Sequence, residues 1–156
     1  TIQIIRKISQ ELRPSILDDL GLISAIDWLK EQYNRRTNIH FTMDMPKNEI
    51  EIKDEYATAV FRITQEALTN IMRHAEAQNV NIQIKLENSE ISLKIQDDGK
   101  GILERKKRGN EPTYGVFGMK ERANSLGGEL MISSNDKQGT SVKLTLPYTQ
   151  KQTGIT

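Results

Sequence analysis

Cysteine is absent from this sequence of 156 residues, which excludes disulfide bonds and thiolate chemistry within it. No stretch approaches the roughly 20 apolar residues that a membrane-spanning helix needs, and no signal peptide is apparent. An excess of one charge is also lacking, because 22 basic and 21 acidic residues leave a net charge of +1. This balance gives no broad basic field for direct binding of nucleic acid. We expect a cytoplasmic domain, and a parent protein with a membrane anchor elsewhere is compatible with it.

Enough apolar residues are present to build one packed domain, since 36% of the sequence is hydrophobic and no low-complexity tract or internal repeat is apparent. Segment 1–13 carries an apolar stripe in helical rhythm, and Pro14 then restarts the chain. Residues 149–156 are polar and indicate a mobile tail. We therefore expect the packed domain to span residues 14–148. The first residue, Thr1, fits a piece of a longer protein.

Alternating apolar residues predict most of the strands. The run from Asn79 to Leu86 is separated by Asn88-Ser89 from a second alternating run that ends at Asp97, which predicts an antiparallel hairpin. Further strands are expected at 39–45, 128–133 and 139–147, and helices near 15–35, 54–75 and 116–126. The pattern predicts an α+β fold, a two-layer α/β sandwich with a mixed, mostly antiparallel sheet packed against helices on one face.

The most informative motif follows the second strand of this hairpin, at residues 95–102. Asp97 ends the strand, and Gly99 and Gly101 follow one residue apart. A carboxylate at this place can accept a hydrogen bond from an exocyclic amine, and glycines allow a flat ring to approach the backbone. The motif therefore indicates a nucleotide pocket. Taken alone, the same five residues also fit an ordinary tight turn after a strand.

The predicted helix at 61–75 carries Glu66 and Asn70 one turn apart at the border of its apolar stripe. A carboxylate and an amide oxygen in this arrangement suit a hydrated magnesium ion, which keeps several waters and takes few protein ligands. The alternative is an ordinary amphipathic helix with polar residues at its border.

Glycines also open the later helix, at Gly115 and Gly118, where free backbone N–H groups and the helix dipole can face a phosphate. Gly127-Gly128 more simply terminate that helix. The intervening loop 103–113 lacks apolar periodicity and contains the cations Arg105–Arg108. This loop is either a lid over a nucleotide or a solvated charge run. The strand at 139–147 carries Thr140 in its second position.

Four blocks follow one another along the chain: the helix at 61–75, the glycine motif at 95–102, the glycines that open the later helix, and the strand at 139–147. Together and in this order they resemble the ATP-binding domain of two-component sensor histidine kinases, within the superfamily that also holds type II topoisomerase, chaperone and mismatch-repair ATPases. The resemblance covers roughly residues 39–147 and implies the Bergerat-type ATP-binding fold. Residues 118–122, together with residues 12–26, resemble the subfamily whose kinases signal to helix-turn-helix response regulators. Segment 1–13 would then be the remnant of a second dimerisation helix.

The resemblance implies a role for each motif residue. Asp97 would bind the adenine amine, with Thr140 supporting its carboxylate, and Asn70 would bind Mg²⁺. Glu66 would orient a metal-bound water or assist the transfer, so that Glu66 and Asn70 are the implied catalytic residues. The full set implied for ATP comprises Asn70, Arg73, His74, Asp97, Gly99, Gly101, Ile102, Gly115, Val116, Gly118, Met119 and Thr140. Thr113 stands where the family often has a glycine, and Asp98 where it commonly has an asparagine.

The function implied is that of a protein histidine kinase, with ATP and Mg²⁺ as ligands. Its γ-phosphate would pass to a histidine in dimerisation and phosphoacceptor helices outside this chain, because His40 and His74 do not fit the acceptor. The other partner would be a cognate response regulator, and the parent would be a homodimer. Two alternatives stay open: a related serine kinase or ATPase, and a degenerate module that uses the fold only for docking.

Overall fold

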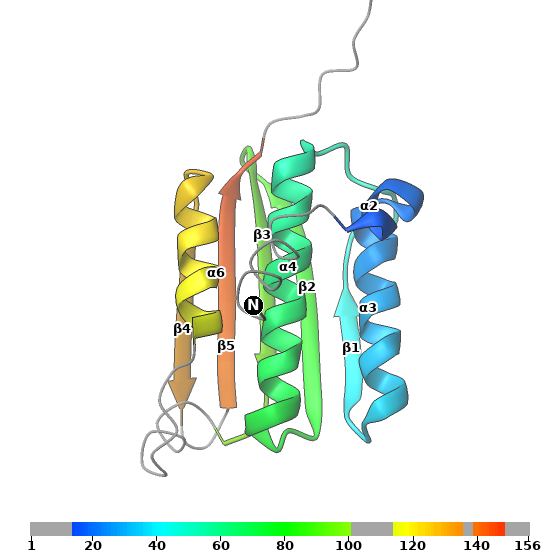
Figure 1. The fold of residues 1–156 in the computed structure, drawn as a ribbon, viewed down its shortest axis with the longest axis vertical. Helices are drawn as coiled ribbons and strands as arrows, with labels where there is room; N and C mark the ends of the chain where they lie inside the picture. The colour runs from blue at the N-terminus through cyan, green and yellow to red at the C-terminus, as the bar shows by residue number, and fades with distance from the viewer. Residues whose placement is uncertain (1–13, 101–113, 136–138, 149–156) are drawn as a thin grey trace, which may run out of the picture.

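A five-stranded sheet with helices on one face forms the domain in the computed structural model, which describes residues 14–100, 114–135 and 139–148 (Figure 1). The strands are β1 (His40–Asp44), β2 (Asn79–Glu87), β3 (Glu90–Asp97), β4 (Glu129–Asn135) and β5 (Gly139–Pro147). Their order in the sheet is β1-β2-β3-β5-β4. β1 pairs with β2 in parallel, and the other neighbours are antiparallel. The predicted α+β fold with a mixed, mostly antiparallel sheet is confirmed.

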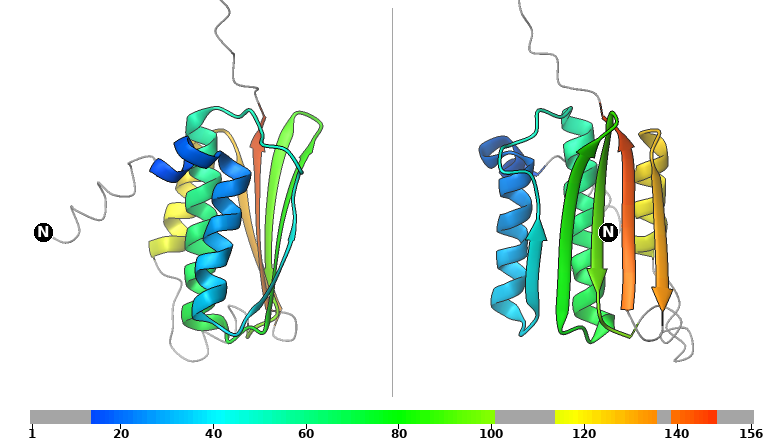
Figure 2. Two further views of the ribbon diagram at one scale, coloured as in Figure 1. Left: turned by 90° about the vertical axis from the view of Figure 1, so that its right-hand side faces the viewer. Right: turned by 180° about the vertical axis from the view of Figure 1, so that it is seen from behind.

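The helices are α2 (Ser15–Leu20), α3 (Leu22–Arg36), α4 (Asp54–Asn70), the π-helix η1 (Ile71–Ala75) and α6 (Tyr114–Ser125). Figure 2 shows α3, α4 and α6 on the same side of the sheet. The alternating pattern of β2 and β3 buries one side chain in two against these helices, as period-two strands do. The largest fully buried side chains come from both layers and include Ile26, Ile63, Leu68, Ile82, Ile91, Leu93, Ile95, Leu144 and Leu146. The core therefore lies between the sheet and its single helical layer.

The prediction of one continuous helix near 15–35 is wrong, because Gly21, with a φ of +85°, separates α2 from α3. Residues other than glycine rarely adopt this conformation. Glu49 then satisfies the start of α3, where its carboxylate accepts hydrogen bonds from the backbone N–H groups of Ile23 (2.9 Å) and Ser24 (2.8 Å). A distant side chain thus supplies the cap that a helix start needs.

The helix expected at 54–75 also changes character, because the regular α-helix ends at Asn70 and continues as the π-helix η1. The N–H of Ile71 is shared between the carbonyls of Ala67 and Leu68. The segment ends at Glu76, whose φ of 50° is left-handed. Short π-helical turns often occur at functional sites, and this one directly follows the predicted magnesium ligand.

The hairpin between β2 and β3 turns at Asn88 and Ser89 as predicted, with φ of 53° and 61°. Such a pair of positive angles is typical of a type I′ turn. The predicted strand at 139–147 is confirmed as β5. The predicted helical remnant 1–13, the lid 103–113 and the tail 149–156 lie outside the described residues. Within the described ranges, no helix is both long and apolar enough to cross a membrane.

Candidate functional site

Asp97 is a buried carboxylate at the end of β3, with an exposed fraction of 3%. Its Oδ1 accepts a hydrogen bond from the backbone N–H of Gly99 at 2.8 Å. The backbone N–H of Thr140, in the neighbouring strand β5, donates to the same oxygen at 3.4 Å. Two backbone donors from different segments therefore fix the carboxylate, as a buried polar group requires.

Gly139 makes this arrangement possible, although no sequence pattern placed it in the site. Its φ is +81°, and a Cβ at this position would meet the backbone carbonyl oxygen of Asp97 and lie 2.7 Å from Oδ1. The chain can therefore pass close to Asp97 only with glycine at residue 139. The sequence signal that could have pointed to Gly139 is its position directly before Thr140. Its contact with Asp97, however, depends on the pairing of β3 with β5.

Asp98 anchors the turn that follows Asp97. Its carboxylate accepts hydrogen bonds from the backbone N–H groups of Gln78 and Asn79, each at 2.8 Å, and from the side-chain amide of Asn79 at 2.7 Å. Partial burial opposes ionisation of Asp98, but these hydrogen bonds outweigh it and lower its pKa. Asp98 therefore joins the start of β2 to the end of β3, beside the glycine turn.

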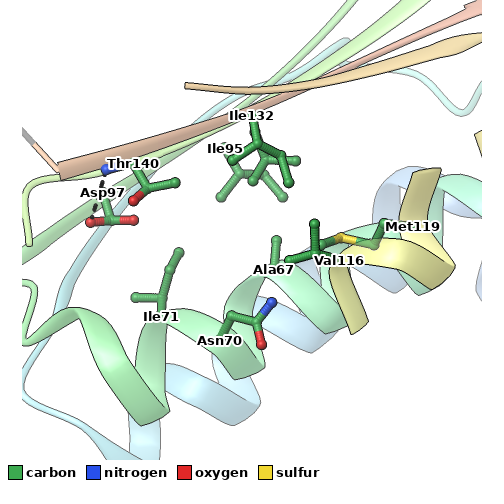
Figure 3. Close-up of a pocket in the computed structure, with 10 residues that line it drawn as sticks. Ala67, Asn70, Ile71, Ile95, Asp97, Val116, Met119, Ile132 and Thr140 are labelled. Atoms are coloured by element: carbon green, nitrogen blue, oxygen red, sulfur yellow. Dashed lines mark hydrogen bonds between the residues drawn. The ribbon is translucent and has the colours of Figure 1, made fainter. Parts of the chain in front are cut away.

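A pocket between the sheet and helices α4 and α6 opens next to Asp97 (Figure 3). The empty space among its lining residues is about 400 Å³, a figure that includes open solvent. Asp97 and Thr140 lie at one end and Val116 and Met119 at the other. The remaining lining residues are Ala67, Asn70, Ile71, Ile95, Ile132 and Val142. The pocket is thus an apolar slot with a carboxylate and an amide at its border, which suits a flat ring that carries a hydrogen-bond donor.

Five of the predicted site residues line this pocket: Asn70, Asp97, Val116, Met119 and Thr140. The apolar walls from Ala67, Ile71, Ile95, Ile132 and Val142 were not assigned to the site from the sequence. All five are apolar positions of predicted helices or strands, so their pattern alone indicated only burial. They line the pocket because α4, α6 and the sheet meet around it.

Glu66 lies outside the pocket lining and is half-buried against α6. A Cβ on Gly115 would overlap the Oε1 of Glu66 and lie 2.6 Å from its carboxyl carbon. Gly115 therefore brings the first turn of α6 directly against the Glu66 carboxylate. Asn70 lies one helical turn after Glu66, so these two predicted catalytic residues share a border of α4.

The other predicted residues lie in different surroundings. Gly118 is exposed, and a Cβ there would meet nothing within 4 Å. Arg73 is exposed on η1. His74 belongs to the same element, but the His74 side chain is not among those that the structure describes. Gly101 and Ile102 lie outside the described residues. The roles expected for these residues toward phosphate remain predictions.

The donor set would fit a magnesium ion held mainly by the phosphates of a nucleotide. Among the residues that the structure describes, no group of three or more His, Cys, Asp or Glu side chains could hold a metal. Asn70 offers an amide oxygen at the pocket border, and Glu66 lies one turn away. One or two oxygen donors are what magnesium takes from a protein when phosphates and waters complete its shell.

Comparison with known proteins identifies relatives of this arrangement. The family model described as "Histidine kinase-, DNA gyrase B-, and HSP90-like ATPase" matches residues 55–150. The chain is 36% identical over 148 residues to the oxygen sensor histidine kinase NreB of Staphylococcus carnosus, covering 93% of this chain and 42% of that protein. It is 32% identical over 148 residues to the signal transduction histidine-protein kinase/phosphatase DegS of Brevibacillus brevis, covering 95% of this chain and 38% of that protein.

The chain therefore spans less than half the length of these curated relatives. Among solved structures, it is similar to the histidine kinase domain from the Erythrobacter litoralis EL346 blue-light activated histidine kinase. The TM-score is 0.66 at 21% sequence identity, and the match covers 81% of this chain and 59% of that chain. At this identity the similarity concerns the fold, which it confirms.

Proposed function

Because this chain belongs to the family of histidine kinase-, DNA gyrase B- and HSP90-like ATPases, we propose that it binds ATP with magnesium and donates the γ-phosphate to a histidine on a separate helical segment. Within that family the chain is the ATP-binding catalytic domain of a sensor histidine kinase. The relatives that share its sequence over most of its length are named as histidine kinases, so a serine kinase is not favoured.

The placement of Asp97 is the observation that carries the proposal. A carboxylate with an exposed fraction of 3% stands at the end of an apolar slot, held by the backbone N–H groups of Gly99 and Thr140. The exocyclic amine of adenine is a donor that such a carboxylate accepts, while Ile95 and Val142 offer apolar contact to the ring. A module that served only for docking would have no use for this arrangement, so that alternative is not favoured.

Asn70 is the residue we assign to magnesium, and Glu66 is assigned to a metal-bound water. Magnesium supplies charge neutralisation at the phosphates during the transfer. Asn70 lines the pocket on the helix side, opposite the sheet, so phosphates that leave the adenine slot on this side pass its amide. Gly115 allows the first turn of α6 to lie against Glu66. This contact would set the position of α6 beside the phosphates.

The reaction proposed is transfer of a phosphoryl group to imidazole. A ring nitrogen of the acceptor histidine forms a bond to the γ-phosphorus while the bond to the β,γ-bridging oxygen breaks. ADP leaves, and the imidazole releases its proton to solvent or to a base on the acceptor segment. The contribution of this chain is positioning and charge stabilisation, which dominate the catalysis of phosphoryl transfer.

The proposed setting is the cytoplasm, which supplies ATP. The partners proposed are the dimerisation and phosphoacceptor helices of the same kinase, the second copy in a homodimer, and a cognate response regulator that receives the phosphoryl group. These partners are supported by the named relatives, which are sensor or signal transduction histidine kinases. Each relative is more than twice as long as the part of it that matches this chain.

Phosphotransfer in trans tests the proposal. The purified chain is incubated with magnesium, γ-³²P-labelled ATP and the dimerisation and phosphoacceptor segment of NreB, the relative with 36% identity. We expect label on that segment that is stable to alkali and labile to acid, as phosphohistidine is. The matched control is the same segment with its acceptor histidine replaced by glutamine. Equal labelling of both segments, or alkali-labile label typical of phosphoserine, would contradict the proposal.

A further inference from the structure

An ion pair joins the two segments that border the nucleotide pocket. The Nζ of Lys100 lies 2.8 Å from the Oε1 of Glu76. Lys100 follows Gly99 in the glycine turn, and Glu76 directly follows the π-helix η1. The first segment leaves β3 at Asp97, while the second continues the helix that carries Asn70. The pair therefore connects the strand of the proposed adenine acceptor to the helix of the proposed magnesium donor.

The backbone of Glu76 has a conformation that is unusual for its residue type. Its φ of 50° and ψ of 40° are left-handed, a region that residues other than glycine seldom occupy. Such conformations persist only where surrounding contacts hold them, and they cluster at functional sites. A glycine would reach this conformation without strain and is the usual residue where a helix ends in this way. Glutamate at this place gains nothing for the backbone, and what it adds is the carboxylate that meets Lys100.

Lys100 is the better covered partner, because its side chain is 23% exposed and that of Glu76 is 69% exposed. The turn that contains Lys100 is also held within the sheet, where the Asp98 carboxylate binds the start of β2. In the same turn the backbone N–H of Gly99 donates to the Oδ1 of Asp97 at 2.8 Å. The ion pair adds a link from this turn to the helical layer. Movement of Lys100 would displace Gly99, and with it a hydrogen bond that orients the Asp97 carboxylate.

We infer that Lys100 and Glu76 are positioning residues of the nucleotide site, and that their ion pair holds the glycine turn so that Asp97 faces the adenine. This inference rests on the proposed function, because it concerns the alignment of that same pocket. Neither residue is among those that line the described pocket, so the pair acts through Gly99 and Asp97. Ion pairs with an exposed partner contribute little to stability. The effect of this pair therefore falls on nucleotide affinity rather than on folding.

The test measures the Kd for ATP with magnesium by calorimetry in Lys100→Gln, in Glu76→Gln and in the double variant Lys100→Glu/Glu76→Lys, which exchanges the two charges. We expect each single variant to raise the Kd by about threefold, the size of effect that one partly exposed ion pair has. The double variant should recover most of the wild-type affinity, because the exchanged charges can pair again. Unfolding midpoints in urea without nucleotide should change little, whereas a merely structural role would lower them.

Two matched controls remove the same charges at exposed positions elsewhere. Lys94→Gln on β3 and Glu87→Gln on β2 should leave the Kd unchanged. Lys100→Arg keeps the charge and should retain the affinity, even where the double variant folds poorly. A loss confined to Lys100→Gln would assign Lys100 to direct contact with the nucleotide and overturn the inference, as would an unchanged Kd in both single variants or a folded double variant without recovery. Failure of the folded wild type to bind ATP would overturn the proposed function itself.

Discussion

Gly115 and Glu66 are in direct contact across the α4–α6 interface, and a Cβ on residue 115 would overlap the Oε1 of Glu66. The first turn of α6 therefore approaches α4 only because residue 115 lacks a side chain. The carboxylate of Glu66 is the movable end of a half-buried side chain. A substitution at Gly115 should thus displace Glu66 rather than unfold the domain.

This contact predicts a coupling that thermodynamic cycles can measure. Gly115→Ala should be more favourable in a Glu66→Ala background than in the wild type, by about 1 kcal/mol, because the overlap is then removed. The matched control is Gly118→Ala, where a Cβ meets nothing within 4 Å. Gly118→Ala should have the same effect in both backgrounds, since only helix propensity changes. Urea unfolding gives both differences, and an identical effect of Gly115→Ala in the two backgrounds would refute the coupling.

Gly139→Ala should destabilise the domain and weaken ATP binding together. The substitution combines a φ of +81° with overlap against the backbone and carboxylate of Asp97. Gly127→Ala is the matched control, because Gly127 has a φ of +75° but a Cβ there would meet only Pro147, at 3.9 Å. We expect about 1 kcal/mol of backbone strain from Gly127→Ala and about 2 kcal/mol or more from Gly139→Ala. Only Gly139→Ala should raise the Kd for ATP, and equal Kd values would contradict this account.

Asn70→Ala should remove most of the effect of magnesium on ATP binding. The amide of Asn70 lies at the pocket border and is the oxygen donor that we assign to the ion. Calorimetry with and without magnesium should show a large difference in Kd for the wild type and almost none for Asn70→Ala. Its unfolding midpoint should change little, since Asn70 is only half-buried. An undiminished magnesium effect in the variant would show that another group binds the ion.

Asp98 predicts a specific dependence of stability on acid pH. Its folded-state pKa is lowered because hydrogen bonds from Asn79 and Gln78 outweigh partial burial. The stabilisation is therefore complete above the unfolded-state pKa of about 3.9, and it is lost as pH falls through the folded-state value. Urea midpoints measured from pH 7 to pH 3 should fall more steeply for the wild type than for Asp98→Asn. Parallel curves would mean that Asp98 does not contribute through its charge.

Local sequence patterns were sufficient for the elements that local rules control. Alternation and the Asn88-Ser89 pair predicted the hairpin that delivers Asp97, and the predicted bounds of strand 139–147 are those of β5. The break at Gly21 was missed because apolar rhythm continues on both sides of it. Its cap comes from Glu49, and no local pattern reveals a partner at that distance.

The parts of the site that were missed depend on packing between elements. Gly139 reaches Asp97 through the pairing of β5 with β3, in which Ser141 stands opposite Gln96. Ala67 and Ile132 line one pocket through the packing of α4 against the sheet. In each case the residue types were visible in the sequence, but the register that joins them is set by tertiary structure.

Calorimetric titration of ATP with magnesium into the wild-type chain and its Asp97→Asn variant tests the central claim most directly. The asparagine side chain of the variant can present an amide donor where the adenine amine needs an acceptor, so two donors would face each other. We predict clear binding by the wild type and an increase of at least about tenfold in the Kd of a variant that remains folded by circular dichroism. Equal affinity in the two proteins, or no binding by the folded wild type, would contradict the assignment of this pocket to ATP.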